Sequence, residues 1–316
     1  MAIFKDYLEN KSPLILHGAL GTEMESLGYD ISGKLWSAKY LLEKPEVIQK
    51  IHETYVAAGA DLITTSSYQA TLPGLIDAGL TEKEAVQIIA LTVQLAKDAR
   101  DKVWATLDDS EKAKRPYPLI SGDVGPYAAY LANGSEYTGD YGQITIKELK
   151  EFHRPRIQIL LDHGVDLLAL ETIPNHLEAQ ALTELLAEEF PEAEAYISFT
   201  VQEPGTISDG TSLDEIAQLV GQSDQILALG INCSSPLLYN QALAILKNAG
   251  KALITYPNSG EVYDGSTQTW KPKDKDALTL VEHSKDWHTQ FGVKILGGCC
   301  RTRPNDIKAL YAEFRT

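Results

Sequence analysis

Short apolar runs alternate with segments of helical period along most of the chain, and glycines mark many of the junctions. Residues 45–58 place apolar side chains at three- and four-residue spacing, which predicts a helix with one buried face. Gly59 is suited to end that helix, and the apolar run 61–65 that follows predicts a buried strand. This stretch therefore predicts a helix that feeds directly into a strand.

The same junction returns several times. Residues 58–63 are echoed at residues 163–168, 249–254 and 291–296. Further strands are predicted at residues 14–16, 119–122, 195–200 and 225–231. Parallel strands buried on both faces read as continuous apolar runs. Eight such strands alternating with helices predict an α/β fold, a (β/α)8 TIM barrel, in one domain spanning residues 1–316.

Three stretches are longer than the connections of a minimal barrel. They are the charged residues 108–118, the Tyr- and Gly-rich residues 127–141 and the polar residues 256–275. We interpret them as insertions, because no shift in composition and no low-complexity tract marks a second domain.

Composition narrows the functional classes. With 316 residues, 44% of them hydrophobic, the chain can bury a large core. A net charge of -16 argues against a nucleic-acid or membrane surface, and no apolar run approaches the length of a membrane span. We therefore expect a cytoplasmic protein that acts on small molecules. The sequence is compatible with a monomer and does not fix the oligomeric state.

In a (β/α)8 barrel the chemistry lies at the carboxyl ends of the strands. The residues that follow the predicted strands are His17, Gly18, Tyr68, Asp123, Glu171, Thr172, Gln202, Asn232, Cys233, residues 257–259, Cys299 and Cys300. All three cysteines of the chain fall in this ring. The sequence therefore predicts that three thiols converge at one end of the barrel.

Three thiolates suit Zn²⁺, which prefers four ligands in a tetrahedron. No local spacing supplies a fourth protein ligand, so we expect an open position for water or substrate. A substrate thiol at such a centre loses its proton near neutral pH and becomes the nucleophile. No protein acid or base is then needed.

Other interpretations of these residues remain open. A buried cysteine is most often a small apolar packing residue, which applies to Cys233 taken alone. Cys299 and Cys300 are adjacent, so they require a turn that the glycines before them can supply, or they form a vicinal disulfide with a redox role. Glu171 is either a helix cap or a contact to a substrate ammonium. His17 and Tyr68 are either packed structural residues or part of the pocket.

The residues around the cysteines resemble the homocysteine S-methyltransferase family. The resemblance is carried by residues 230–233 and 297–301, preceded by residues 18–23. It extends over residues 35–38, 67–70, 125–127, 133–137, 152–156, 171–172 and 256–261. These segments look like the small stand-alone branch, whose members use S-methylmethionine or S-adenosylmethionine as methyl donor. The cobalamin-dependent relatives carry further domains, so cobalamin is not expected here.

The resemblance implies a zinc-dependent methyltransferase that converts L-homocysteine to methionine. It implies that Cys233, Cys299 and Cys300 hold the zinc, that Glu171 helps to bind the substrate ammonium and that Asn232 orients the site. His17, Gly18, Tyr68 and Thr172 are further expected substrate-binding residues. The family usually has Asp where this chain has His17, so one expected carboxylate contact is missing. Two rivals are the same fold and zinc site acting on another thiol or selenol, and a vicinal-cysteine redox protein. A third is a non-enzymatic zinc- or amino-acid-binding protein.

Overall fold

The computed structural model describes residues 3–32, 36–264, 269–271 and 277–315. Its central feature is a sheet of eight parallel strands whose order around the sheet is β1-β10-β7-β6-β5-β4-β3-β2. The strands are β1 (Leu14–Ile15), β2 (Leu62–Thr64), β3 (Leu119–Val124), β4 (Leu167–Ile173), β5 (Ala195–Phe199), β6 (Ile226–Asn232), β7 (Ala252–Tyr256) and β10 (Ile295–Leu296). The predicted (β/α)8 barrel in a single domain is confirmed.

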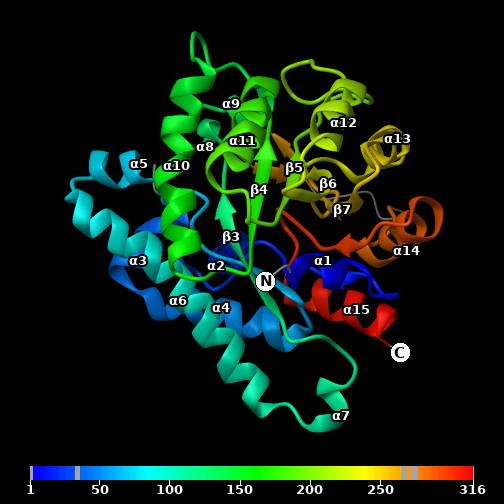
Figure 1. The fold of residues 1–316 in the computed structure, drawn as a ribbon. Coiled ribbons are helices and arrows are strands. Elements are labelled where there is room, and N and C mark those ends of the chain that lie inside the picture. Colours follow the sequence, from blue (N-terminus) through cyan, green and yellow to red (C-terminus); the bar gives the residue numbers. More distant parts are fainter. Residues whose placement is uncertain (1–2, 33–35, 265–268, 272–276, 316) are drawn as a thin grey trace.

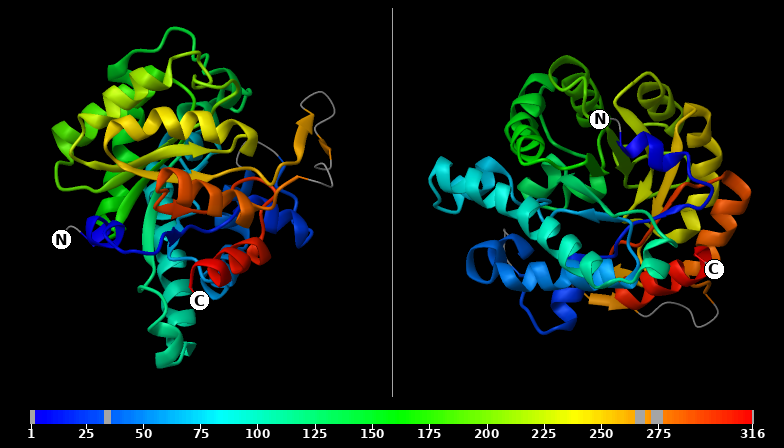
Figure 2. Two further views of the ribbon diagram at one scale, coloured as in Figure 1. Left: turned by 90° about the vertical axis from the view of Figure 1, so that its right-hand side faces the viewer. Right: turned by 60° about the horizontal axis from the view of Figure 1, so that its bottom comes forward.

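The described chain forms fifteen α-helices, and the longer ones lie around the outside of the strands, as Figures 1 and 2 show. They are α1 (Ile3–Leu8), α2 (Leu20–Ser26), α3 (Lys39–Glu43), α4 (Pro45–Ala58), α5 (Leu72–Asp77), α6 (Glu82–Thr106), α7 (Asp109–Lys112), α8 (Tyr127–Leu131), α9 (Ser135–Thr138), α10 (Ile146–Asp162), α11 (His176–Glu189), α12 (Leu213–Gly221), α13 (Tyr239–Leu246), α14 (Leu280–Phe291) and α15 (Pro304–Phe314). Helix α4 ends at Gly59 in the left-handed conformation, with φ 107°, as the sequence predicts. No helix in the described part of the chain is both long and apolar enough to cross a membrane.

The barrel closes between its first two strands. Leu16 forms a parallel bridge with Leu62, the amide of His17 donates to the Leu62 carbonyl at 3.2 Å, and the amide of Asp61 donates to the Ile15 carbonyl at 2.6 Å. Arg315, just after α15, donates to the carbonyl of Pro13 and to the carboxylate of Asp61, at 2.9 and 2.5 Å. The chain end therefore reinforces this seam from the amino ends of the strands.

Alternation along the strands divides the core into two parts. One cluster fills the barrel interior, with Leu14, Leu16, Leu62, Leu119, Leu167, Ala169, Tyr196, Ala228, Ile254, Tyr256 and Ile295, and includes Phe4 of α1. The other lies between the strands and the surrounding helices. In β4, Leu167 and Ala169 face inward while Leu168 and Leu170 face the helices. The same period aims Glu171 into the barrel mouth.

The three predicted insertions contain short helices and strands. Residues 108–118 contain the single turn α7 beyond the long helix α6, which projects from the barrel in Figure 1. Residues 127–141 contain α8 and α9, which follow β3. Residues 256–275 contain the antiparallel strands β8 (Val262–Asp264) and β9 (Thr269–Lys271), which stand away from the barrel in Figure 2. The remaining parts of that prediction, residues 265–268 and 272–275, lie outside the described residues.

Candidate functional site

The three cysteines meet at the carboxyl end of the barrel. Cys233 follows β6, and Cys299 and Cys300 follow β10. Their sulfur atoms all lie within 4.8 Å of one another, and the Sγ atoms of Cys233 and Cys300 are 3.6 Å apart. Among the described residues, these form the one cluster of three or more His, Cys, Asp or Glu side chains arranged to hold a metal ion. The predicted convergence is confirmed.

The spacing of these sulfurs matches a tetrahedral metal. A zinc ion with Zn–S bonds of about 2.3 Å holds two of its sulfurs about 3.8 Å apart, and the Cys233–Cys300 separation is close to that. All three sulfurs are thiols rather than disulfides, and each cysteine is partly buried. The residues present therefore fit a metal ion held by three sulfurs, while the identity of that metal stays a prediction.

Backbone hydrogen bonds tie both cysteine segments to the loop after β7. The amide of Cys299 donates to the Pro257 carbonyl at 2.7 Å, and the amide of Ser259 donates to the Cys300 carbonyl at 3.0 Å. The amide of Cys233 donates to the Tyr256 carbonyl at 3.3 Å. One loop thus fixes the relative positions of sulfurs that are far apart in the sequence.

The two glycines before Cys299 act differently from the sequence prediction. They were expected to supply a turn, yet neither is among the described residues with positive φ. A Cβ at Gly297 would lie 2.7 Å from Leu16 Cβ, and one at Gly298 would lie 2.5 Å from the Thr302 side chain. The glycines therefore permit close packing, and the left-handed residues are Cys233, with φ 49°, and Arg301, with φ 67°.

The three cysteine thiols differ in pKa. Hydrogen bonds from Cys233 and Cys299 lower the pKa of the Cys300 thiol well below its usual range. The guanidinium of Arg301 also favours the Cys300 thiolate, and it forms an ion pair with Glu261 at 2.6 Å. Cys300 is thus the thiol most readily ionised in the cluster.

Glu171 lies beside the cysteine cluster. Its Oε2 accepts a hydrogen bond from the Tyr256 hydroxyl at 3.2 Å, and that hydroxyl also contacts the Ser198 hydroxyl. Burial raises the pKa of Glu171 to about 7. Glu171 and Thr172 lie inside β4 rather than after it, because the strand extends to Ile173, beyond its predicted end. The role of Glu171 in substrate binding stays a prediction.

Asn232 and Thr172 form a pair across two strands. The Asn232 Oδ1 accepts from the Thr172 amide at 3.1 Å, and the Asn232 Nδ2 donates to the Thr172 Oγ1 at 2.8 Å. Thr172 has φ 64°, which is rare for a β-branched residue. Asn232 therefore orients the end of β4.

His17 and Gly18 pack toward helix α4 rather than toward the sulfurs. The His17 ring lies 5.7 Å from the Tyr55 ring, and a Cβ at Gly18 would lie 3.0 Å from Tyr55. Burial lowers the pKa of His17 to about 4, so its ring is neutral at pH 7. The His17 carbonyl accepts from the Gly298 amide at 3.4 Å. The backbone of His17, more than its ring, thus supports the cysteine segment.

Two tyrosines, Tyr68 and Tyr137, lie near the cluster. Tyr68 packs over Gly125, where a Cβ would come within 2.7 Å of its ring, and its hydroxyl reaches Thr172. Tyr137, at the end of α9, is 45% exposed. Burial of its hydroxyl, followed by the charges of Cys233 and Cys300, raises its pKa. Glu136 precedes it, and burial raises the pKa of its carboxyl group.

Four residues near the cluster were not assigned to the site from sequence. Asp123 was among the residues after strands but received no role, and Tyr256, Glu136 and Tyr137 fell in presumed insertions. A signal existed for two of them, because Asp123 and Tyr256 share the inward alternation of β3 and β7. Glu136 and Tyr137 have no such pattern, since their position depends on how the loop between β3 and α10 folds.

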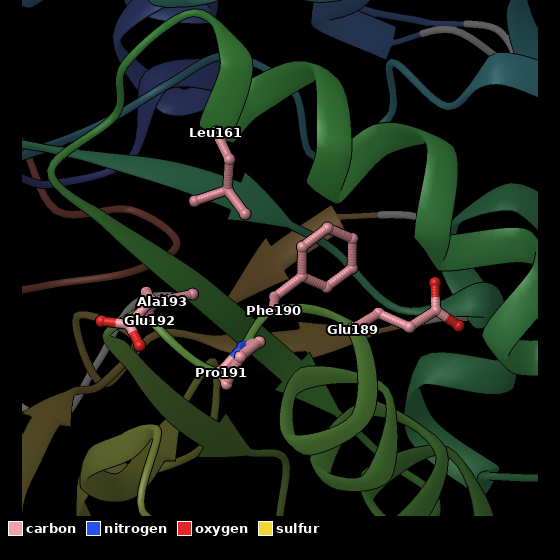
Figure 3. A pocket seen from close by; sticks show the side chains of 6 residues that line it. All are labelled: Leu161, Glu189, Phe190, Pro191, Glu192 and Ala193. Atoms are coloured by element: carbon pink, nitrogen blue, oxygen red, sulfur yellow. The ribbon is translucent and has the colours of Figure 1, made fainter.

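A separate hollow lies at the opposite end of the barrel, where β5 begins. Figure 3 shows its lining, which consists of Leu161, Glu189 and residues 190–193. Its volume is about 310 Å³. The lining holds one small cluster of apolar groups and two carboxylates, and it includes none of the predicted site residues. The hollow is therefore separate from the cysteine cluster.

The chain is similar to known proteins along nearly its whole length. The profile of the family described as homocysteine S-methyltransferase matches residues 14–314. The chain is 45% identical to homocysteine S-methyltransferase YbgG of Bacillus subtilis, over 96% of this chain and 95% of that one. It is 40% identical to a selenocysteine methyltransferase of Astragalus bisulcatus, over 94% and 91%. The metallated form of the Escherichia coli homocysteine methyltransferase MmuM superposes with a TM-score of 0.85 at 40% identity, covering 98% and 99%. The chain therefore belongs to the homocysteine S-methyltransferase family.

Proposed function

We propose that this enzyme transfers a methyl group from a sulfonium donor, S-methylmethionine or S-adenosylmethionine, to the sulfur of L-homocysteine and forms methionine. We further propose that Cys233, Cys299 and Cys300 hold a zinc ion for this reaction. The observation that carries the proposal is the convergence of the three sulfurs within 4.8 Å at the barrel mouth of a chain of this family. The metallated form of the Escherichia coli relative adds support for metal binding by this chain.

Zinc at this site would supply one effect, a lower pKa for the acceptor thiol, so that it reacts as a thiolate. The protein residues do the rest. The loop after β7 holds the sulfur ligands in place, and Glu171 offers a carboxylate to the acceptor ammonium. Asn232 fixes the end of β4 next to Glu171 through its two bonds to Thr172.

The transfer itself is a direct displacement. The acceptor sulfur donates an electron pair to the methyl carbon, and the bond from that carbon to the donor sulfur breaks. The breaking pair stays on the donor sulfur, which leaves as a neutral thioether. No proton has to reach the leaving group, which is consistent with a site whose carboxyl groups serve binding.

The donor is best accommodated beside Tyr137 and Glu136. A sulfonium carries a positive charge, which aromatic faces and carboxylates attract. Tyr137 is an exposed aromatic close to the sulfurs, and Glu136 adds a carboxyl group next to it. Tyr68 is a third candidate for contact with the donor, because burial and then the charges of Glu136, Cys233 and Glu171 act on its hydroxyl and raise its pKa.

A selenol acceptor is the second candidate. The 40% identity to a selenocysteine methyltransferase favours this alternative over a redox protein. A selenolate is a soft ligand like a thiolate, so the same cysteine cluster would accept it. The two acceptors differ in chain length as well as in the reacting atom, and a direct competition assay separates them.

The test combines metal content with turnover. Purified protein is assayed for zinc by elemental analysis and for methionine formation from homocysteine and each sulfonium donor. Cys233→Ser is the test variant, and Ser259→Ala, which keeps the Cys300 contact through its backbone amide, is the matched control. We expect one zinc per chain and turnover in the wild type and the control, with both lost in Cys233→Ser.

The outcomes separate the alternatives. Zinc without methyl transfer to homocysteine from any sulfonium donor would contradict the proposed reaction. Activity that survives chelation but is lost to alkylation would point to redox chemistry of the cysteines. Methyl transfer to selenocysteine at a higher kcat/KM than to homocysteine would select the second candidate.

A further inference from the structure

A second carboxyl group lies directly beside Glu171. Asp123, on β3, is within hydrogen-bonding reach of the Glu171 carboxyl group, on β4. Asp123 is 3% exposed, and its Oδ1 has no hydrogen-bond partner. A buried acceptor without a partner is uncommon, and at a site of this kind it indicates that something is still to be bound.

The nearest cation does not satisfy this group. Arg156 contributes positive charge near Asp123, yet the two form no ion pair within 4.0 Å in the described structure. The Arg156 guanidinium donates instead to the carbonyls of Ser67 and Tyr68, at 3.3 and 3.1 Å, and to that of Gly125. These bonds hold the guanidinium against the backbone.

The ionised form of Asp123 is disfavoured beside Glu171 when no ligand is present. Burial raises the pKa of Asp123 well above its usual range, and the neighbouring Glu171 charge raises it further. Two carboxyl groups in contact cannot both ionise readily. A ligand ammonium changes that balance, because its positive charge stabilises a second negative charge.

We propose that Asp123 and Glu171 act together as a carboxyl pair that receives the ammonium group of the amino-acid acceptor, with Glu171 in contact with it and Asp123 supplying the second carboxyl group from behind. This inference rests on the proposed function, since it assigns the acceptor's amino group. It also accounts for His17. The ring at that position is neutral and packs on Tyr55, so the second carboxyl group comes from β3 instead.

Asp123 is a positioning residue in this scheme, so its test must separate recognition of the ammonium from general packing. The probe pair is L-homocysteine and 4-mercaptobutanoate, which has the same sulfur, carbon chain and carboxylate but no amino group. Binding of each to the zinc-loaded protein is measured by calorimetry, and KM and kcat are measured with the same sulfonium donor. The calorimetric readout does not depend on turnover.

Asp123→Asn is the main variant, because its amide keeps the size of the side chain and can donate to Glu171. Asp123→Ser is a second variant for the case that the amide disturbs folding. Ser121→Ala is the matched control, since Ser121 lies two residues earlier on the same inward face of β3 and bonds to Thr64 at 3.0 Å. Zinc content and circular dichroism confirm that each variant is folded and metal-competent.

We expect Asp123→Asn to weaken homocysteine binding and raise its KM by about tenfold or more, because the carboxyl pair loses the second negative charge that attracts the ammonium. Binding of 4-mercaptobutanoate and kcat should change by less than about twofold, and Ser121→Ala should leave the preference for homocysteine intact. An equal loss for both acceptors, or no loss for either, would overturn the assignment. If the wild type binds homocysteine but transfers no methyl group, the proposed function fails while the calorimetric comparison still decides the role of Asp123.

Discussion

Asn232 holds Thr172 at two points, accepting from its amide at 3.1 Å and donating to its hydroxyl at 2.8 Å. These bonds compensate for a backbone conformation that β-branched residues rarely adopt, since Thr172 has φ 64°. The residue just before it is Glu171. A single amide side chain therefore sets the direction in which a buried carboxylate enters the site.

Removing this amide should affect stability and acceptor binding together. We expect Asn232→Ala to lower the free energy of unfolding by about 1 to 3 kcal/mol, because two buried partners on Thr172 lose their hydrogen bonds. It should also raise the KM for homocysteine. Chemical denaturation and steady-state kinetics measure the two effects. Thr172→Ser, which retains the hydroxyl, is the control, and a stable Asn232→Ala protein with unchanged KM would contradict the role given to this pair.

Close packing of Gly298 should matter for the metal more than for the fold. In Gly298→Ala the new methyl would lie 2.5 Å from the Thr302 side chain, whose hydroxyl donates to the Cys299 carbonyl at 2.6 Å. We expect zinc affinity to fall at least about tenfold as Cys299 shifts, given how sensitive metal sites are to their supporting contacts. A competition assay with a chromogenic chelator measures this.

Gly79→Ala provides the comparison for that variant. Gly79 has φ 98° and open space around its Cβ position, so alanine there costs about 1 to 2 kcal/mol of backbone strain without touching the site. Its zinc affinity should equal that of the wild type. Equal loss of zinc in both variants would mean that global destabilisation, rather than the Thr302 contact, controls the metal.

Exposure of Tyr137 predicts a donor-specific effect. If its ring attracts the sulfonium charge, Tyr137→Ala should raise the KM for the donor by about threefold to thirtyfold while leaving the KM for homocysteine unchanged. Tyr137→Phe keeps the aromatic face and should behave like the wild type. Steady-state kinetics with each substrate varied in turn decide this, and a loss confined to homocysteine would place the donor elsewhere.

Because His52 is buried, we expect the free energy of unfolding to fall in acid. Burial lowers the pKa of His52 to about 3, and its Nε2 has no hydrogen-bond partner. Its folded-state pKa is below that of an unfolded histidine, so its contribution to stability is present above about pH 6.5 and is lost as the pH falls toward 3. Protons bind the unfolded chain first and favour unfolding.

His52→Phe should remove this part of the pH dependence. We expect the decrease in unfolding free energy between pH 6.5 and pH 4 to be smaller in the variant, by on the order of 3 kcal/mol. Urea denaturation at a series of pH values measures the difference. Parallel curves for wild type and His52→Phe would contradict the prediction.

The fold could be predicted from sequence because parallel strands buried on both faces leave a plain record of apolar runs. The glycine at the end of α4 and the apolar run of β2 show this directly. The cysteine cluster was also predictable, since strand ends meet at one face of a barrel. The exact ends were not, because β4 continues through Glu171 to Ile173, held by contacts to β5 and β6 that no local pattern encodes.

Side-chain direction was the harder part of the site. His17 follows the first predicted strand, so the sequence places it in the same ring of residues as the cysteines. Its ring nevertheless packs on Tyr55, because the residue before it, Leu16, takes the inward position. Asp123 shows the opposite case. Its partnership with Glu171 depends on the register between β3 and β4, in which Asp123 lies opposite Ala169, and register is fixed only when the whole sheet assembles.

The seam between β1 and β2 also has a consequence for how the chain is made. Few backbone hydrogen bonds join these two strands, and the Arg315 side chain donates hydrogen bonds to Pro13 and Asp61 across the seam. Contacts that join residues so far apart in sequence form late and slowly. A nascent chain would hold an open, curved sheet until β10 is made, because β10 is the strand that joins β1 to β7. Chaperone binding during synthesis should accordingly concentrate on the unpaired edges of β1 and β7.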